Sequence, residues 1–134
     1  MKTEVHFLST HFNIFKPRDY FINEGCFGDD LAQRLIVQLR SQGIATDDAP
    51  GQEDFGWYFH FQIERISHTF VVGFQPNDAV AGDQWIGTIE RKRGMLGYLV
   101  GARHRGILPR AIEAIDLALK AIPEIRSVSW HEKE

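Results

Sequence analysis

The sequence contains a single cysteine among its 134 residues, so it cannot form an internal disulfide. This excludes the disulfide scaffolds of small secreted proteins and zinc sites built from cysteines alone. The chain also lacks the roughly 18 consecutive apolar residues that a membrane-spanning helix needs, and residues 1–7 lack the apolar core of a signal peptide. We therefore expect a cytoplasmic protein that does not insert into membranes.

Positive charge is in slight deficit, since 15 Lys and Arg residues are outnumbered by 18 Asp and Glu residues. The formal net charge of -3 gives no overall attraction to phosphate backbones or anionic lipids, so we do not expect a nucleic acid or a membrane as partner. Hydrophobic residues make up 43% of the chain and aromatic residues 12%, which is typical of a folded globular protein. We predict one domain over residues 1–134.

Sequence motifs of the common catalytic loops are absent, although the chain contains 12 glycines. Neither G-x-x-x-x-G-K-[ST] nor G-x-G-x-x-G is present, so the glycines do not form a recognisable phosphate-binding loop. The G-x-S-x-G turn that carries the nucleophile of α/β-hydrolases is absent as well. We therefore assign no catalytic residue, no cofactor and no metal, and the sequence favours a non-catalytic protein.

Apolar and polar residues alternate in the centre of the chain, which is typical of half-buried β-strands. In the segment 57–66, Tyr58 and His60 fall on the polar face. The residues predicted to face the core are Trp57, Phe59, Phe61 and Ile63. A break at 65–68 and similar alternation at 69–74 and 85–90 predict an antiparallel meander of three strands.

Two other segments have apolar residues at helical spacing. The first follows Asp29, whose charge favours a helix N-terminus, and ends near Gly43. The second covers residues 108–122, with Pro109 tolerated in its first turn and Pro123 ending it. Both helices are amphipathic, so we expect each to pack its apolar stripe on a sheet.

The order of the predicted elements indicates the fold class. Two further strands are expected near residues 5–8 and 127–131, and a short extended piece is expected at 44–46. A mainly antiparallel sheet of about five strands, with both helices packed on one face, lets every amphipathic element bury its apolar side. We therefore predict an α+β two-layer sandwich.

The sheet face opposite the two helices has no predicted element left to cover it. Tyr58 and His60 lie on this face and are candidate contacts with another protein or with a second copy of the chain. His6 and His131 have the same phase, and the three imidazoles would converge if their strands were neighbours. No H-x-H or H-E-x-x-H pair supports a metal site, so ordinary exposed histidines are the alternative.

Charged residues are unevenly distributed along the chain. Residues 91–110 contain no acidic residue, whereas residues 19–64 contain nine acidic residues and only two basic ones. The candidate partner contacts in the segment 91–110 are its basic residues Arg91, Lys92, Arg93, Arg103 and Arg105. Together with neighbouring apolar residues they would dock an acidic partner or an anion, and a solvated loop is the alternative.

Cys26 lies just before the first predicted helix, where the helix dipole can stabilise a thiolate. This placement raises an alternative function, a small enzyme or anion-binding protein with a pocket between Cys26 and the basic segment 91–110. No phosphate-binding cysteine loop and no partner histidine are identifiable, and a lone cysteine is commonly a small buried hydrophobe. The sequence leaves both interpretations of Cys26 open.

Four short segments carry a resemblance: Glu-Asp-Phe-Gly-Trp at 53–57, Gln-Trp-Ile at 84–86, Gly-Met-Leu at 94–96 and the C-terminal Trp130-His131. In these segments the chain resembles small bacterial α+β proteins to which no activity is assigned. The resemblance implies no catalytic or ligand-binding residue. The missing catalytic motifs and the uneven charge distribution favour a small cytoplasmic protein-interaction module, immunity-like or regulatory, without catalytic activity.

Overall fold

The computed structural model describes residues 1–54, 56–76, 83–91 and 106–133. In chain order, the elements of these residues are β1 (Lys2–Leu8), α1 (Asp29–Ser41), β2 (Gly51–Gln52), β3 (Trp57–Ile63), β4 (Ile66–Phe74), β5 (Gln84–Glu90), α3 (Pro109–Lys120) and β6 (Arg126–Glu132). Neither of these two helices is long and apolar enough to cross a membrane.

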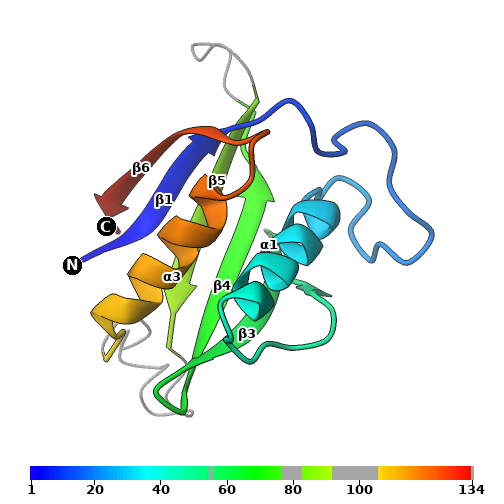
Figure 1. The fold of residues 1–134 in the computed structure, drawn as a ribbon. Coiled ribbons are helices and arrows are strands. Elements are labelled where there is room, and N and C mark those ends of the chain that lie inside the picture. The colour runs from blue at the N-terminus through cyan, green and yellow to red at the C-terminus, as the bar shows by residue number, and fades with distance from the viewer. Residues whose placement is uncertain (55, 77–82, 92–105, 134) are drawn as a thin grey trace.

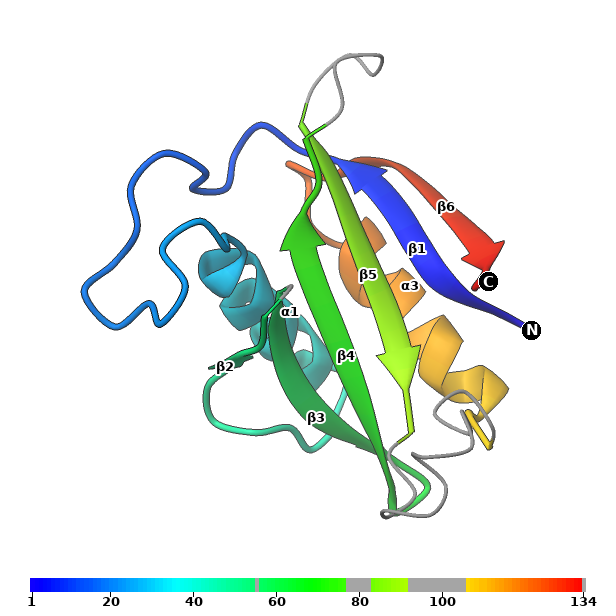
Figure 2. The same cartoon turned by 180° about the vertical axis from the view of Figure 1, so that it is seen from behind.

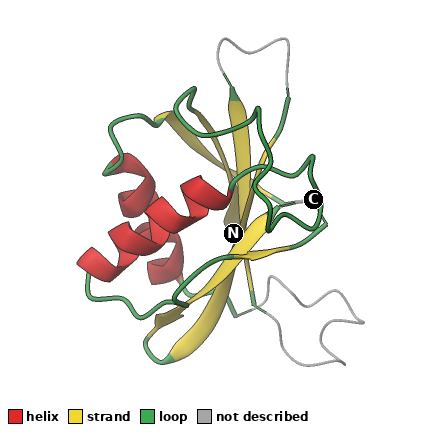
Figure 3. Ribbon diagram, turned by 90° about the vertical axis from the view of Figure 1, so that its right-hand side faces the viewer, coloured by secondary structure: helices red, strands yellow, loops and turns green. Residues whose placement is uncertain are grey.

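The six described strands form one sheet in the order β2-β3-β4-β5-β1-β6, and every neighbouring pair is antiparallel. Figure 1 shows α1 and α3 on one face of this sheet, and the turned view in Figure 3 places both helices on the same side. Figure 2 shows the opposite face, which we call the open face and over which neither helix passes. The structure confirms the predicted α+β fold, with a sheet and two helices packed on one side.

Alternation along the strands decides which side chains lie under the helices. The rings of Phe59, Phe61 and Phe70 are 0% exposed, and Trp85 is equally buried. The helices cover them with a buried stripe of their own, formed by Leu31, Leu35, Leu39, Ile115 and Leu119. Burial of each such side chain contributes about 1.5–3 kcal/mol to folding. The predicted phase of the central strands is therefore confirmed.

The hairpin between β3 and β4 is tighter than the sequence predicted. Ile63 pairs directly with Ile66, and the turn consists of Glu64 and Arg65, which have φ angles of 51° and 66°. Two left-handed residues in succession form a turn whose twist matches that of antiparallel strands. Neither residue is a glycine or an asparagine, so the sequence carries no turn signal here. The predicted break is wrong, and His68 lies within β4.

The outer strands differ more from the prediction. β1 and β6 are longer than expected and lie next to each other, which places the two ends of the described chain side by side (Figure 1). The segment 44–46 contributes only an isolated bridge between Thr46 and Phe61 instead of a strand. β2, which pairs Gly51 with Tyr58, is too short to show an alternation in the sequence.

One close contact in the core depends on a glycine. Gly87 of β5 pairs with Val72 of β4 and lies between two buried residues of its own strand, Trp85 and Ile89, on the helix side. A β-carbon at this position would lie 2.3 Å from Cζ of Phe70. Only glycine therefore leaves room for the phenylalanine ring in this layer.

Candidate functional site

The open face contains a shallow depression where β1, β4 and β5 lie side by side. The register pairs Thr88 of β5 with Val71 of β4 on one side and with Glu4 of β1 on the other. The depression has a volume of about 250 Å³, and it is lined by Glu4, Glu53, Val71, Gly73, Phe74, Gln75, Ile86, Thr88, Glu90 and Lys133. We call these residues the acidic depression.

The acidic depression contains four charged side chains. Glu4, Glu53 and Glu90 are carboxylates, and Lys133 is an amine. Glu90 and Thr88 are each only 7% exposed, and Val71 and Ile86 add half-buried apolar surface beside them. Charges that are partly removed from water are screened less by solvent and salt, so they attract cations more strongly than exposed carboxylates do. The depression is therefore suited to a cationic group attached to an apolar one.

Tyr58 and His60 lie on the open face, as the sequence predicted, and both are half-buried. The ring of Tyr58 covers Gly51 of β2, where a β-carbon would lie 2.7 Å from Cζ of the ring. The imidazole Nδ1–H and the backbone N–H of His60 both donate to one carboxylate oxygen of Asp47 at 2.8 Å. Tyr58 is paired with Val71 and so borders the acidic depression, whereas Asp47 fixes His60 at the margin of the sheet.

Two of the three predicted histidines come together on the open face. His6 of β1 and His131 of β6 have ring centroids 4.2 Å apart, because their strands are neighbours. His60 is on β3, which β4 and β5 separate from β1, so the condition for a convergence of all three imidazoles is not met. Among the residues that the structure describes, no group of three or more possible metal ligands is found.

The histidine pair has polar neighbours on the same strands. The Nε2–H of His6 donates to Glu4 at 2.9 Å, and the Ser129 hydroxyl lies 2.9 Å from Nε2 of His131. A hydroxyl beside an imidazole is part of a catalytic triad only when a carboxylate orients the imidazole. In the described residues no carboxylate is hydrogen-bonded to His131.

Most of the predicted basic segment falls outside the described residues, namely Lys92, Arg93, Arg103 and Arg105. Arg91, which follows β5, is half-buried, and its guanidinium donates to the carbonyl of Gly106 at 3.1 Å. This hydrogen bond connects the end of β5 to the residues that precede α3. Arg91 thus has a role within the fold, and its use as a partner contact stays a prediction.

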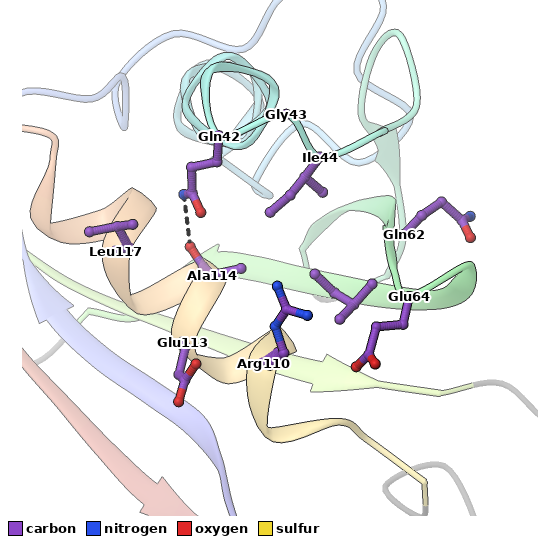
Figure 4. A pocket seen from close by; sticks show the side chains of 10 residues that line it. Gln42, Gly43, Ile44, Gln62, Glu64, Arg110, Glu113, Ala114 and Leu117 are labelled. Carbon is purple, nitrogen blue, oxygen red and sulfur yellow. Dashed lines mark hydrogen bonds between the residues drawn. The ribbon is translucent and has the colours of Figure 1, made fainter.

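A second concavity lies in the helix layer, between the end of α1, the start of α3 and the end of β3 (Figure 4). Its volume is about 390 Å³, and we call it the helix-layer pocket. Arg110 points into it, with Glu64 and Glu113 on the rim, and the amide of Gln42 donates to the carbonyl of Ala114 at 3.2 Å. The three charged side chains are exposed, so water and salt screen them. Their opposite signs suit a small ligand that carries both charges.

Cys26 is 9% exposed and packs in the core, and the basic residues Lys92, Arg93, Arg103 and Arg105 of the alternative pocket lie outside the described residues. Burial raises the pKa of its thiol, which is the opposite of what a reactive thiolate needs. Its carbonyl accepts a hydrogen bond from the Trp57 indole at 2.9 Å, and its sulfur lies 4.0 Å from the carbonyl of Glu53. The structure therefore favours the interpretation of Cys26 as a small buried hydrophobe.

His68 is a buried polar residue that the sequence analysis did not single out. Its side chain is fully buried in β4, where Nδ1–H donates to the carbonyl of Ile66 at 3.0 Å and Nε2 accepts from the backbone N–H of Leu108 at 3.1 Å. Burial lowers the pKa of the imidazole, so the ring is neutral at neutral pH. This side chain joins β4 to the residue that precedes α3.

The acidic depression and the helix-layer pocket lie on opposite sides of the sheet and are built from different segments. The first gathers negative charge over half-buried apolar residues, and the second combines both charge signs at the surface. No protein-family model, no curated protein and no solved structure matches the chain.

Proposed function

We propose that this protein is a small cytoplasmic interaction module, immunity-like or regulatory and without catalytic activity, whose open face binds another protein. The acidic depression carries the proposal. It combines the carboxylates of Glu4, Glu53 and Glu90 with the apolar side chains of Val71 and Ile86. In protein interfaces, recesses that combine apolar surface with a few charged groups hold the anchor side chains of the partner.

The charge of the depression specifies the chemistry of the partner. A Lys or Arg side chain would place its cationic group beside Glu4 and Glu90 and its methylene stem on Ile86. A basic partner is also attracted to this face over a distance, which increases the association rate at low salt. The partner is therefore a protein that presents a basic side chain within an apolar surface.

Site-specific photo-crosslinking tests whether the open face contacts a partner. Val71→benzoylphenylalanine places the reactive group in the acidic depression, and Val37→benzoylphenylalanine, at a 60% exposed position of α1, is the matched control. After irradiation in cells of the source organism, we expect a protein adduct from position 71 and no adduct of the same mass from position 37. Equal adducts from both positions, or none from position 71, would contradict the proposal.

Charge variants then test the chemistry with the purified partner. Glu4→Lys adds positive charge to the acidic depression, and Lys133→Glu removes it. We expect the first variant to raise the Kd about tenfold and the second to lower it about threefold, with both effects shrinking as salt is added. Thermal unfolding of both variants checks that the fold is intact. Changes of the opposite sign in the Kd would indicate an acidic partner. An acidic partner is the kind that the basic segment 91–110 was predicted to bind.

The helix-layer pocket favours a second candidate function, the binding of a small zwitterion. Arg110 points into the pocket and would bind a carboxylate, while Glu64 and Glu113 would bind an ammonium group (Figure 4). Titration with glycine, followed by the NMR signals of the Gln42 side-chain amide, tests this candidate. We expect saturable shifts that Arg110→Gln abolishes, and the absence of shifts at about 10 mM glycine, a concentration that reveals even weak sites, would remove it.

A further inference from the structure

The paired imidazoles of His6 and His131 have no role in the function proposed above, since neither of them lines the acidic depression. In the register of β1 and β6, His6 lies opposite Ser129 and His131 lies opposite Glu4. The two rings therefore meet on a diagonal between neighbouring strands, with centroids 4.2 Å apart and planes inclined by 37°. They line a concavity of about 760 Å³ where β1 begins and β6 ends (Figure 2), so solutes can reach both rings.

The carboxylate of Glu4 holds the ring of His6 in one orientation. The Nε2–H of His6 donates to Glu4 at 2.9 Å, and the two side chains are only 28% and 25% exposed. Because an ionised carboxylate can only accept, the proton of this hydrogen bond belongs to Nε2, and Nδ1 keeps its lone pair. Histidines that bind metals usually donate their other ring N–H to a carboxylate in this way, which fixes the tautomer. His6 therefore has the arrangement of a metal ligand.

The ring of His131 has one nitrogen beside a hydroxyl and can move. Its Nε2 lies 2.9 Å from the Ser129 hydroxyl, which can accept a hydrogen bond as well as donate one. When Nε2–H donates to this hydroxyl, Nδ1 of His131 keeps its lone pair. His131 is exposed on the edge strand β6, and exposed side chains change rotamer within nanoseconds. The His131 ring can therefore turn a free nitrogen toward an ion that is held by His6.

We propose that His6 and His131 together bind one divalent transition-metal ion, with Glu4 as the positioning residue. Each ring supplies one nitrogen, which is Nδ1 in the case of His6. Two imidazoles that bind one ion at about 2.1 Å have ring centres about 4.5–5 Å apart. The centroid distance of 4.2 Å is slightly shorter, so a small outward turn of His131 is enough to admit the ion. Water completes the coordination, since the described residues provide no group of three ligands.

The donor atoms and the nearby charges define the class of ion. Imidazole nitrogens suit Zn²⁺, Cu²⁺ and Ni²⁺, whereas Mg²⁺ and Ca²⁺ prefer oxygen ligands. The concavity also contains two carboxylates, on Glu4 and Glu132, and two amines, on Lys2 and Lys133. Both lysines are exposed, and their long stems let the amines stay in water away from the ion. The carboxylate of Glu4 is less exposed, so its attraction for a cation is screened less.

Calorimetric titration of the purified chain with Zn²⁺ tests the site. We expect His6→Gln and His131→Gln each to raise the Kd at least about tenfold, because even the loss of an orienting partner costs 10–100-fold in metal affinity. His60→Gln is the matched control, since this imidazole is also on the open face and bonded to a carboxylate, that of Asp47. No saturable binding of Zn²⁺ up to about 1 mM, or an equal loss in His60→Gln, would overturn the proposal.

Pulsed EPR of the equimolar Cu²⁺ complex separates ligand loss from a general effect on the fold. The method counts coordinated imidazoles through the nitrogen of each ring that does not bind the ion. We expect two imidazoles in the wild-type chain and in His60→Gln, and one in His6→Gln and in His131→Gln. A single coordinated imidazole in the wild-type chain would overturn the proposal.

Glu4→Gln tests the positioning role of Glu4. This variant keeps an oxygen that can accept from His6 and loses the charge, so we expect the Kd for Zn²⁺ to rise about tenfold while two imidazoles stay coordinated to Cu²⁺. Wild-type affinity in Glu4→Gln would overturn the role of Glu4. All of these measurements use the isolated chain without a protein partner, so their failure is distinguishable from failure of the proposed function.

Discussion

The two faces of this sheet are made from alternate residues of the same strands, yet they have different chemistry. On the helix side, Phe59 and Phe70 are completely buried by α1 and α3. On the open face, Tyr58, Thr88 and Glu90 surround or line the acidic depression, together with the apolar Val71 and Ile86. Because side chains alternate along a strand, one set of strands can supply both the core and a binding surface.

The two faces also differ in how their side chains are held. The helix side is a close-packed layer in which a missing or added atom changes the packing. On the open face, local hydrogen bonds position the polar groups, as Asp47 does for His60 and Glu4 does for His6. We therefore expect substitutions on the helix side to reduce stability and substitutions on the open face to reduce binding.

The largest difference in the free energy of unfolding is expected between substitutions of Phe59 and of its neighbour Tyr58. Phe59→Ala removes a fully buried ring and leaves a cavity, so we expect a loss of about 3–5 kcal/mol in the free energy of unfolding. Tyr58→Ala removes a half-buried ring from the open face and should cost about 1 kcal/mol. Urea unfolding measures both values. A larger loss for Tyr58→Ala would mean that the two faces are interchanged.

A smaller loss of stability is expected when a side chain is added to the packed core. Gly87→Ala would place a methyl group against the ring of Phe70, and the resulting shift of the ring should cost about 1–3 kcal/mol in urea unfolding. Combining Gly87→Ala with Phe70→Leu should recover part of the loss relative to Phe70→Leu alone, because the smaller side chain leaves room. Additive losses in the double variant would show that the two residues are not in contact.

The pH dependence of stability should reveal the neutral, buried ring of His68. Burial lowers the pKa of this imidazole below its ordinary value of 6.5, so the unfolded chain takes up a proton where the folded chain does not. Its contribution to stability is therefore intact above about pH 6.5 and is lost as the pH falls through that value, with a slope of at most about 1.4 kcal/mol per pH unit.

Unfolding by urea at about pH 7.5 and about pH 5.5, on either side of the ordinary value, measures this effect. His68→Gln should be less stable than wild type at the higher pH and should lose less stability on acidification. His6→Gln, on the open face, is the matched control. If both variants showed the same pH dependence as wild type, His68 would not be the group that titrates.

The smallest effect is expected for a carboxylate of the open face. Glu4→Gln removes a charge from the acidic depression and keeps the shape of the side chain, so the free energy of unfolding should change by less than about 0.5 kcal/mol. Calorimetric unfolding measures this difference. A loss of more than about 2 kcal/mol would show that Glu4 is a structural residue of the kind found on the helix side.

Much of the fold could be predicted from the sequence where the hydrophobic pattern is regular. The alternation in β3 and the apolar stripes of α1 and α3 predicted where these three elements lie in the chain and which of their faces is buried. The structure confirms both. The turn at Glu64 and Arg65 could not be predicted, because neither residue has a preference for the left-handed region. As a result, the start of β4 and the role of His68 were missed.

The candidate site was predicted only in part for a related reason. Tyr58 was placed on the open face from its phase alone, and it borders the acidic depression. Glu4 and Glu90 were not recognised, since single acidic residues on separate strands carry no local signal. The hydrogen bond from the Arg91 guanidinium to the carbonyl of Gly106 joins residues that are far apart in the chain, and it could not be predicted either.

The sequence by itself determined which residues form helices and strands and which side of each is apolar, because both properties follow from spacing within a few residues. The tertiary structure decided that β1 lies between β5 and β6. That order brings Glu4 beside Thr88, whose other neighbour is Val71, and leaves β6 at the edge of the sheet. Strand order depends on contacts between residues that are far apart in the chain, and no local pattern encodes them.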